Sequence, residues 1–88
     1  VREPWELEIC RIEGALSLPL SHLRQPSPAE LPLGLSPDAE TVLYCKAGVR
    51  SMMACEILRQ GYGFNKVENL SEGIDQWAEI VDPAMPRY

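Results

Sequence analysis

The middle of this 88-residue chain reads Thr41-Val42-Leu43-Tyr44-Cys45-Lys46-Ala47-Gly48-Val49-Arg50-Ser51. Its first four residues form a short β-branched and aromatic run, which is typical of a central strand. A helix is predicted from 49 to 60, because apolar residues recur there at helical spacing. They are Met53, Ala54, Ile57 and Leu58. Cys45 therefore begins a tight loop at the carboxyl end of a strand, where open α/β sheets bind ligands.

Other elements are predicted on either side of this segment. Pro4 suits the first turn of a helix over 4–9, and Ser21 can cap a second short helix that runs through Arg24. Strands are predicted over 15–18 and 67–70. Four prolines between 26 and 37 predict an irregular loop, and an extended tail is expected over 82–88.

The ends and buried faces of the helices are predicted as well. Gly61 is expected to end the central helix in the left-handed conformation, and Ser71 to cap the final helix. Cys55 falls off the central apolar stripe and is expected to be partly exposed, whereas Trp5 is expected in the core. The buried face of the final helix is expected to comprise Ile74, Trp77, Ala78 and Val81.

Strands that alternate with helices predict an α/β fold of three layers, a central mostly parallel sheet with helices on both faces. We expect one domain over 1–88. Because the chain begins abruptly at Val1-Arg2-Glu3-Pro4, we expect it to be a fragment of a longer protein whose first strand is incomplete.

Charge and cysteine content exclude several functions. The net charge of −5 disfavours binding to nucleic acid or to an anionic membrane, and no apolar run is long enough to span a bilayer. Three cysteines without a close pair, together with one histidine, disfavour a disulfide framework and a structural zinc site. A cytoplasmic location is the expectation.

Cys45 is the predicted nucleophile. Unpaired N–H groups and the dipole at the following helix start favour a thiolate, and the charges of Lys46 and Arg50 act in the same direction. A thiolate needs no separate base. The alternative from the residues alone is a buried structural cysteine. Cys10 and Cys55 are expected to be packing or incidental residues.

Several segments resemble one known family. The segment from Cys45 to Ser51 resembles the active-site loop of rhodanese-like sulfurtransferases, with four residues between cysteine and arginine. Val1-Arg2-Glu3-Pro4 resembles the family's Asp-Val-Arg segment without its aspartate, and Ile12-Glu13-Gly14-Ala15 its Ile-x-Gly-Ala turn. The family's closing strand and helix are similar to Gly61-Tyr62, Val67, Leu70, Gly73 and Trp77, although Glu72 replaces the first glycine of a usual Gly-Gly pair.

The resemblance implies a sulfurtransferase that carries sulfur as a persulfide on Cys45, without a further cofactor. Thiosulfate or a cysteine desulfurase would be the donor, and Arg2 is a candidate supporting residue. The loop implied to hold the persulfide comprises Lys46, Ala47, Gly48, Val49, Arg50 and Ser51.

The loop and the tail Asp82-Pro83-Ala84-Met85-Pro86-Arg87-Tyr88 together resemble the C-terminal rhodanese domain of adenylyltransferase/sulfurtransferase proteins in molybdopterin and thiamine biosynthesis. This closer resemblance implies an N-terminal adenylyltransferase domain. It also implies that the acceptor is the adenylylated C-terminus of a ubiquitin-like sulfur carrier.

Two other functions stay open. One is a rhodanese-like cysteine phosphatase or arsenate reductase. Such enzymes resemble this chain in fold, but their loop has one more residue between the cysteine and the arginine. The other is a non-catalytic interaction module.

Overall fold

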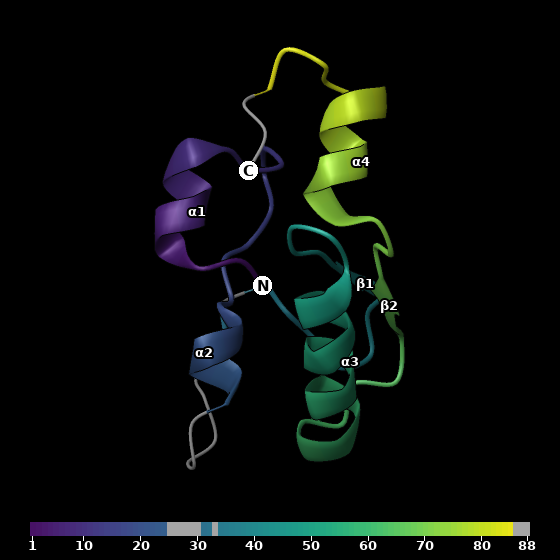
Figure 1. Ribbon diagram of the computed structural model, residues 1–88. Coiled ribbons are helices and arrows are strands. Elements are labelled where there is room, and N and C mark those ends of the chain that lie inside the picture. The colour runs from purple at the N-terminus through teal and green to yellow at the C-terminus, as the bar shows by residue number, and fades with distance from the viewer. Residues whose placement is uncertain (25–30, 33, 86–88) are drawn as a thin grey trace.

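A computed structural model describes residues 1–24, 31–32 and 34–85. Figure 1 shows the elements in chain order. They are α1 (Pro4–Ile9), α2 (Leu20–Leu23), β1 (Thr41–Leu43), α3 (Val49–Gly61), β2 (Val67–Asn69) and α4 (Gly73–Ile80). The predicted helices over 4–9 and 49–60 and the predicted strands over 41–44 and 67–70 are thereby confirmed to within a residue or two. Of the predicted irregular loop, residues 26–30 and 33 lie outside the described part of the chain, as do residues 86–88 of the tail.

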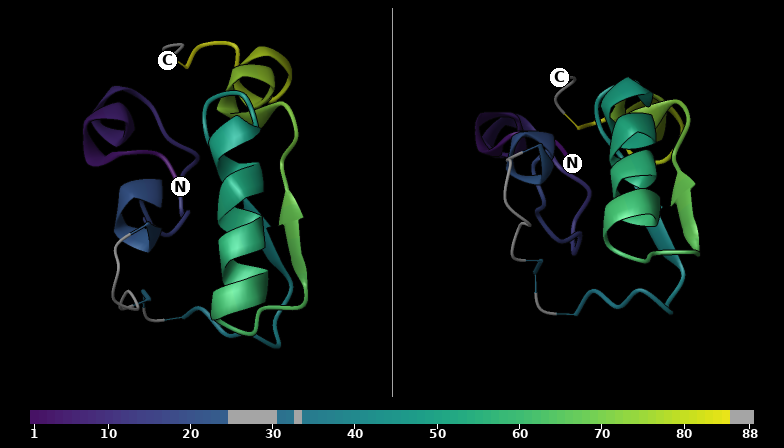
Figure 2. Two further views of the ribbon diagram at one scale, coloured as in Figure 1. Left: turned by 60° about the horizontal axis from the view of Figure 1, so that its bottom comes forward. Right: turned by 90° about the horizontal axis from the view of Figure 1, so that it is seen from below.

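The two strands form a parallel sheet, in which Thr41 pairs with Val67 and Leu43 with Asn69. Helix α3 connects them and packs against both, while α2 packs against α3 (Figure 2). The predicted α/β class with a parallel sheet is therefore confirmed. Because both strands run in one direction, their carboxyl ends meet at the same edge, next to the start of α3.

The described residues do not form the three layers that the sequence predicts. Leu43 is buried toward α3, whereas the side chain of Val42 points to the opposite face and is 62% exposed. The strand predicted over 15–18 is also absent from the described residues, which contain a sheet of two strands. Ala15 instead closes a turn by donating from its N–H to the carbonyl of Ile12 at 3.2 Å, and no ladder forms beyond it.

Three predicted helix ends are wrong. Ser21 lies inside α2 and donates from its hydroxyl to Glu3 Oε1 at 2.7 Å. The residue before α4 is Glu72 rather than Ser71, and no side chain caps that helix. Gly61 is still helical, and the left-handed turn falls at Gly63, with a φ of 72°. The tail is not fully extended either, since Met85 N–H bonds to the Asp82 carbonyl at 3.0 Å.

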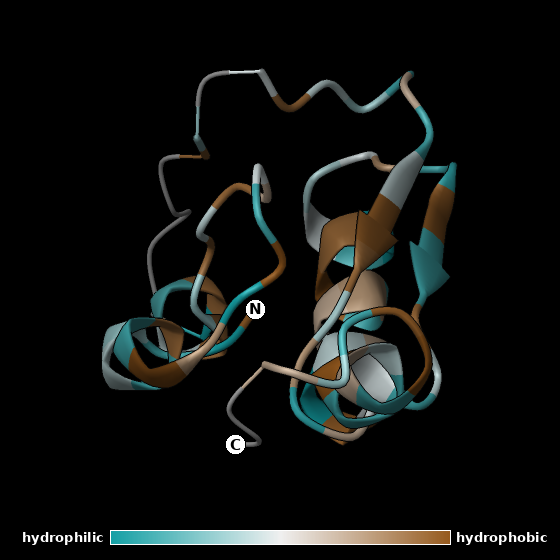
Figure 3. Ribbon diagram, turned by 90° about the horizontal axis from the view of Figure 1, so that it is seen from above, coloured by the Kyte–Doolittle hydropathy of each residue, from teal (hydrophilic) through white to brown (hydrophobic). Residues whose placement is uncertain are grey.

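The core lies between α2, α3 and the sheet, and Figure 3 shows hydrophobic residues on both strands and on the neighbouring turns of α3. The buried cluster comprises Leu18, Leu20, Leu23, Leu43, Ala54, Cys55, Leu58, Phe64 and Val67. Cys55 is therefore buried, contrary to expectation, and Met53 is exposed. The buried side of α3 follows Ser51, Ala54, Cys55 and Leu58, whose spacing places them on one helical face.

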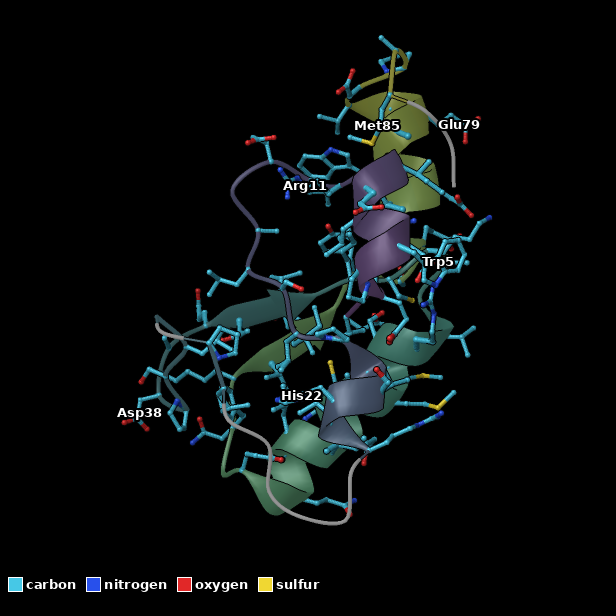
Figure 4. The ribbon with its side chains drawn as sticks, turned by 90° about the vertical axis from the view of Figure 1, so that its left-hand side faces the viewer. Trp5, Arg11, His22, Asp38, Glu79 and Met85 are labelled. Carbon is cyan, nitrogen blue, oxygen red and sulfur yellow. The ribbon has the colours of Figure 1, made fainter. Side chains whose placement is uncertain are left out.

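Two residues expected in the core lie on the surface. Trp5, in α1, is 53% exposed (Figure 4), and Val81, which follows α4, is 58% exposed. Trp77 is half-buried, whereas Ile74 and Ala78 are buried as predicted. The sequence gives the helical period of these segments, but the neighbouring elements decide which side of each helix is covered.

Candidate active site

The loop that carries Cys45 is shaped by a glycine. Gly48 precedes α3 with a φ of 96°, which favours glycine. A Cβ atom at Gly48 would overlap the carbonyl of Ser71. The chain can therefore reverse from β1 into α3 only if this residue has no side chain.

The sulfur of Cys45 lies inside this loop and faces its donors. Gly48 N–H donates to Sγ at 3.1 Å, and the N–H and the hydroxyl of Ser51 both lie 3.4 Å from Sγ. The orientation of the thiol toward the amides at the start of α3, expected from the sequence, is thus observed. Such an arrangement stabilises an anion at that position.

Two opposing effects act on the pKa of Cys45. Burial raises this pKa, but hydrogen bonds from the Ser51 hydroxyl and from the amides of Ser51, Gly48 and Ala47 together lower it below the ordinary value of 9.0. For Cys55, burial is the main effect, and it raises the pKa of that thiol. Cys45 is therefore a stronger acid than Cys55, as a nucleophile should be.

The two cations near the loop have acidic partners. Arg50 donates through both terminal nitrogens to Glu6, at 2.5 Å and 2.8 Å, and Lys46 Nζ lies 3.5 Å from Asp75 Oδ2. The hydrogen-bond donors of the loop are the largest effects that lower the pKa of Cys45. The charge of Arg50 also interacts with Cys45, in the direction expected from the sequence.

Arg2 supports the site through Glu6. Its side chain is fully buried and lies 3.7 Å from Glu6 Oε2, while Nη1 donates to the carbonyl of Cys10 at 2.8 Å. Arg2, Glu6 and Arg50 thus form a chain of charges from α1 to the first turn of α3. Arg50 holds the pKa of Glu6 down at about 2, although burial acts in the opposite direction.

Helix α4 fixes the loop from the other side. The N–H of Ile74 donates to the Cys45 carbonyl at 2.9 Å, and the N–H of Asp75 to the Lys46 carbonyl at 3.1 Å. Gly73, with a φ of 62°, allows this approach, since a Cβ there would overlap the Lys46 carbonyl. Glu72 has a φ of −101°, so the departure from a Gly-Gly pair introduces no backbone strain.

Asn69 is a site residue that the sequence analysis missed. Its Nδ2 donates to the Gly48 carbonyl at 2.9 Å, and its Oδ1 accepts a short hydrogen bond from the Ser51 hydroxyl. A signal was present, because Asn69 is a polar residue at the carboxyl end of a strand parallel to the one that leads to Cys45. Glu6 was missed too, and its side chain is only 3% exposed.

The thiol is more enclosed than expected. Cys45 is 1% exposed, although Ala47 and Val49 on the outside of the loop are exposed. The carboxyl edge of a sheet, where the sequence places Cys45, commonly opens to solvent, but in this conformation the loop turns Sγ inward to reach its donors. A reagent reaches Sγ only after a displacement of the atoms around it.

The described residues contain no group of three or more His, Cys, Asp or Glu side chains that could hold a metal ion. All three cysteines have free thiols. No helix in the described ranges is long and apolar enough to cross a membrane.

The site is a single cysteine thiol held against the amides of a helix start, at the carboxyl edge of a parallel sheet. This arrangement is typical of sites that stabilise a sulfur anion. Residues 1–80 match the family described as the rhodanese-like domain, and the chain belongs to this family.

Several curated proteins are similar to the chain. A sulfurtransferase of Allochromatium vinosum is 40% identical over 79 residues, which is 89% of this chain and 67% of that protein. The rhodanese-like/PpiC domain-containing protein 12 of Arabidopsis thaliana and the probable adenylyltransferase/sulfurtransferase MoeZ of Mycobacterium tuberculosis are each 38% identical over the whole chain. The chain spans only 29% and 21% of the length of these two proteins. No solved structure gave a match.

Proposed function

We propose that the chain is a sulfurtransferase domain in which Cys45 carries sulfur as a persulfide. The thiolate attacks the outer sulfur of thiosulfate or of a donor persulfide, the donor's S–S bond breaks, and sulfite or the donor thiolate leaves with the electron pair. The observation that carries this proposal is the set of donors on Sγ, of which Gly48 N–H is the nearest at 3.1 Å. These donors stabilise the attacking thiolate.

The same loop would hold the persulfide. Its charge lies one S–S bond beyond Sγ, about 2 Å away, so amides of the loop from Lys46 to Ser51 are the candidate donors. Lys46 would attract an anionic donor, as its side chain is 42% exposed. Arg50 acts mainly through its pairing with Glu6, which holds the first turn of α3 in place.

For the acceptor, we propose the adenylylated C-terminus of a ubiquitin-like sulfur carrier. The outer sulfur would attack the activated carboxyl carbon, the bond to the phosphate oxygen would break, and AMP would leave, which gives an acyl disulfide with Cys45. A second thiol would then attack the Cys45 sulfur, form a disulfide with it and release the carrier as a thiocarboxylate. Support comes from similarity to proteins named adenylyltransferase and sulfurtransferase, from Mycobacterium tuberculosis and Drosophila ananassae. On this proposal, residues 1–88 act beside an adenylyltransferase domain in the cytoplasm, in molybdopterin or thiamine biosynthesis.

Sulfur chemistry fits the loop better than phosphate or arsenate chemistry. Four residues separate Cys45 from Arg50, which leaves less room than the longer loops of phosphatases. Arg50 is also engaged by both carboxylate oxygens of Glu6. An arginine that is already paired in this way is poorly placed to bind a tetrahedral oxyanion.

Intact-mass measurement after incubation with thiosulfate tests the proposal. We expect the protein to gain one sulfur atom, which cyanide should remove as thiocyanate. Cys45→Ala should abolish the gain, whereas Cys55→Ala should retain it, because that thiol has a raised pKa and lies in the core.

A wild-type protein that gains no sulfur, or gains it equally in Cys45→Ala, would refute the assignment. The first result would favour an interaction module. Turnover of p-nitrophenyl phosphate that depends on Cys45 would favour the phosphatase instead.

A further inference from the structure

The side chain of Asn69 connects two parts of the loop around Cys45. Its Nδ2 donates to the carbonyl of Gly48 at 2.9 Å. Because that carbonyl can only accept, the orientation of the amide group is determined, and Oδ1 must face the hydroxyl of Ser51. The hydroxyl donates to Oδ1 in a short hydrogen bond.

Both residues that Asn69 contacts are donors to the sulfur. Gly48 contributes its N–H at 3.1 Å, and Ser51 contributes its N–H and hydroxyl at 3.4 Å. Ser51 is fully buried, so protein groups surround its hydroxyl. Asn69 makes no hydrogen bond to Sγ itself, so its influence on the thiol passes through Gly48 and Ser51.

The backbone of Asn69 is held by the sheet. Asn69 lies opposite Leu43 in the parallel register, and the next residue, Leu70, donates from its N–H to the Leu43 carbonyl at 2.9 Å. The amide therefore projects from a rigid strand end toward a glycine-containing loop. A rigid support of this kind keeps a donor array preorganised for an anion.

We propose that Asn69 is a positioning residue for sulfur transfer, which holds the Gly48 amide toward the sulfur of Cys45 and fixes the position of the Ser51 hydroxyl beside it. This inference rests on the proposed function for its catalytic meaning. The orienting role itself is a property of the loop and can be measured without any sulfur donor.

Ser51 has one hydroxyl hydrogen and two neighbouring acceptors. While Cys45 is a neutral thiol, the Ser51 hydroxyl donates its hydrogen to Asn69 Oδ1. A lone pair of the same hydroxyl oxygen can then accept a hydrogen bond from the S–H group of Cys45. When Cys45 is a thiolate, the hydrogen can rotate to the sulfur. Loss of Asn69 would free that hydrogen, but it would also release Gly48, whose amide is the nearest donor. The Ser51 hydroxyl already lies 3.4 Å from Sγ in the presence of Asn69, so freeing it adds little, whereas releasing Gly48 loses the amide donor at 3.1 Å.

The test is Asn69→Leu, which keeps the approximate shape and removes both polar contacts. We expect the pKa of Cys45 to rise by about half a unit or more, as measured by the pH dependence of its alkylation in peptide-resolved mass spectrometry. Amide hydrogen exchange at Gly48 should accelerate, while Ala54 and Leu58 in the same helix stay protected. Asn65→Leu, at an exposed position before β2, is the matched control and should change neither quantity.

The effect should also depend on Ser51. In a Ser51→Ala background, Asn69→Leu should raise the pKa of Cys45 by at least as much as it does in the wild type, since the opposing gain at the Ser51 hydroxyl is absent and only the loss at Gly48 remains. If Asn69→Leu does not fold, Asn69→Asp retains the acceptor for Ser51 and loses the donor to Gly48. Faster exchange at Gly48 is expected in that variant too.

An unchanged or lowered pKa of Cys45 in Asn69→Leu, with Gly48 exchange as in the wild type, would overturn the inference. Failure of the proposed function is a separate result. In that case thiosulfate would leave no sulfur on the wild-type protein, whatever Asn69→Leu does to the pKa.

Discussion

At the level of single residues, the acidity of Cys45 depends on neutral donors. Burial of the thiol raises its pKa, and the net lowering arises because a hydroxyl and several amides point at the sulfur. The side-chain hydrogen bond of Ser51 is the largest of the lowering effects. Hydrogen bonds to a charged group are stronger than those to a neutral one, so the thiolate gains more from them than the thiol does.

Ser51→Ala removes that hydroxyl without altering the backbone amide. We expect the pKa of Cys45 to rise by about half a unit to one unit, which lowers the thiolate fraction throughout the titration range. The rate of Cys45 alkylation as a function of pH measures this shift. Ser36→Ala, on the exposed loop before β1, is the control. An unchanged profile in Ser51→Ala would contradict the role given to the hydroxyl.

At the level of elements, the loop after β1 and the start of α4 fit together through two glycines. Gly48 approaches the carbonyl of Ser71, and Gly73 approaches the carbonyl of Lys46, both with positive φ. The first-turn amides of α4 then bind the carbonyls of Cys45 and Lys46. The orientation of the loop that carries Cys45 is therefore determined by an element that contributes no side chain to the sulfur.

Gly48→Ala should destabilise the domain far more than Gly63→Ala. Both glycines have positive φ, which costs an alanine about 1–2 kcal/mol. Only Gly48 lacks space for a Cβ atom, because nothing lies within 4 Å of one at Gly63. We expect a loss of at least about 3 kcal/mol for Gly48→Ala. Urea denaturation measures the free energy of unfolding of the two variants. Equal losses of that free energy would show that the clash with Ser71 is relieved at little cost in stability.

At the level of the whole molecule, the amino-terminal helices and the sheet with its helices are joined by packing and by charge. Helix α2 packs on α3, and Glu6 of α1 pairs with Arg50 of α3 across 44 positions of sequence (Figures 1 and 2). Arg2 places a second guanidinium beside Glu6. A buried carboxyl group between two cations stabilises the fold only while it is charged, because protonation leaves both cations without their anionic partner.

This ion-pair network makes stability sensitive to acid. Because the pKa of Glu6 falls from its ordinary 4.5 to about 2, chiefly through Arg50, the charged form is favoured in the folded state. The resulting stability, about 3 kcal/mol at most, is fully present above pH 4.5 and is lost as pH falls toward 2.

Glu6→Gln should therefore be destabilised at neutral pH and should lose less stability between pH 4.5 and 2 than the wild type does. Urea denaturation across that range measures both effects. Glu56→Gln, which removes a carboxylate from an exposed pair with Arg59, is the control. Parallel pH profiles for the wild type and Glu6→Gln would contradict this account.

The sequence by itself determined the two strands, the central helix and the loop between them, though not the strand predicted over 15–18 or the helix ends. The run Thr41 to Tyr44, the apolar spacing after Val49 and the position of Gly48 depend on residues close together in the chain, whose local preferences act before any tertiary contact forms. The same holds for Cys45 at the strand end and for the amides that it faces.

Only the tertiary structure decided which side of each element is covered and which distant groups meet. Cys55 is buried and Trp5 is exposed because neighbouring elements cover one side of each helix and leave the other to solvent. Asn69 reaches Ser51, and Glu6 reaches Arg50, because packing brings strand ends and helix starts to within hydrogen-bond distance. Local propensity carries no information about such pairs, since their energy exists only once the chain has folded.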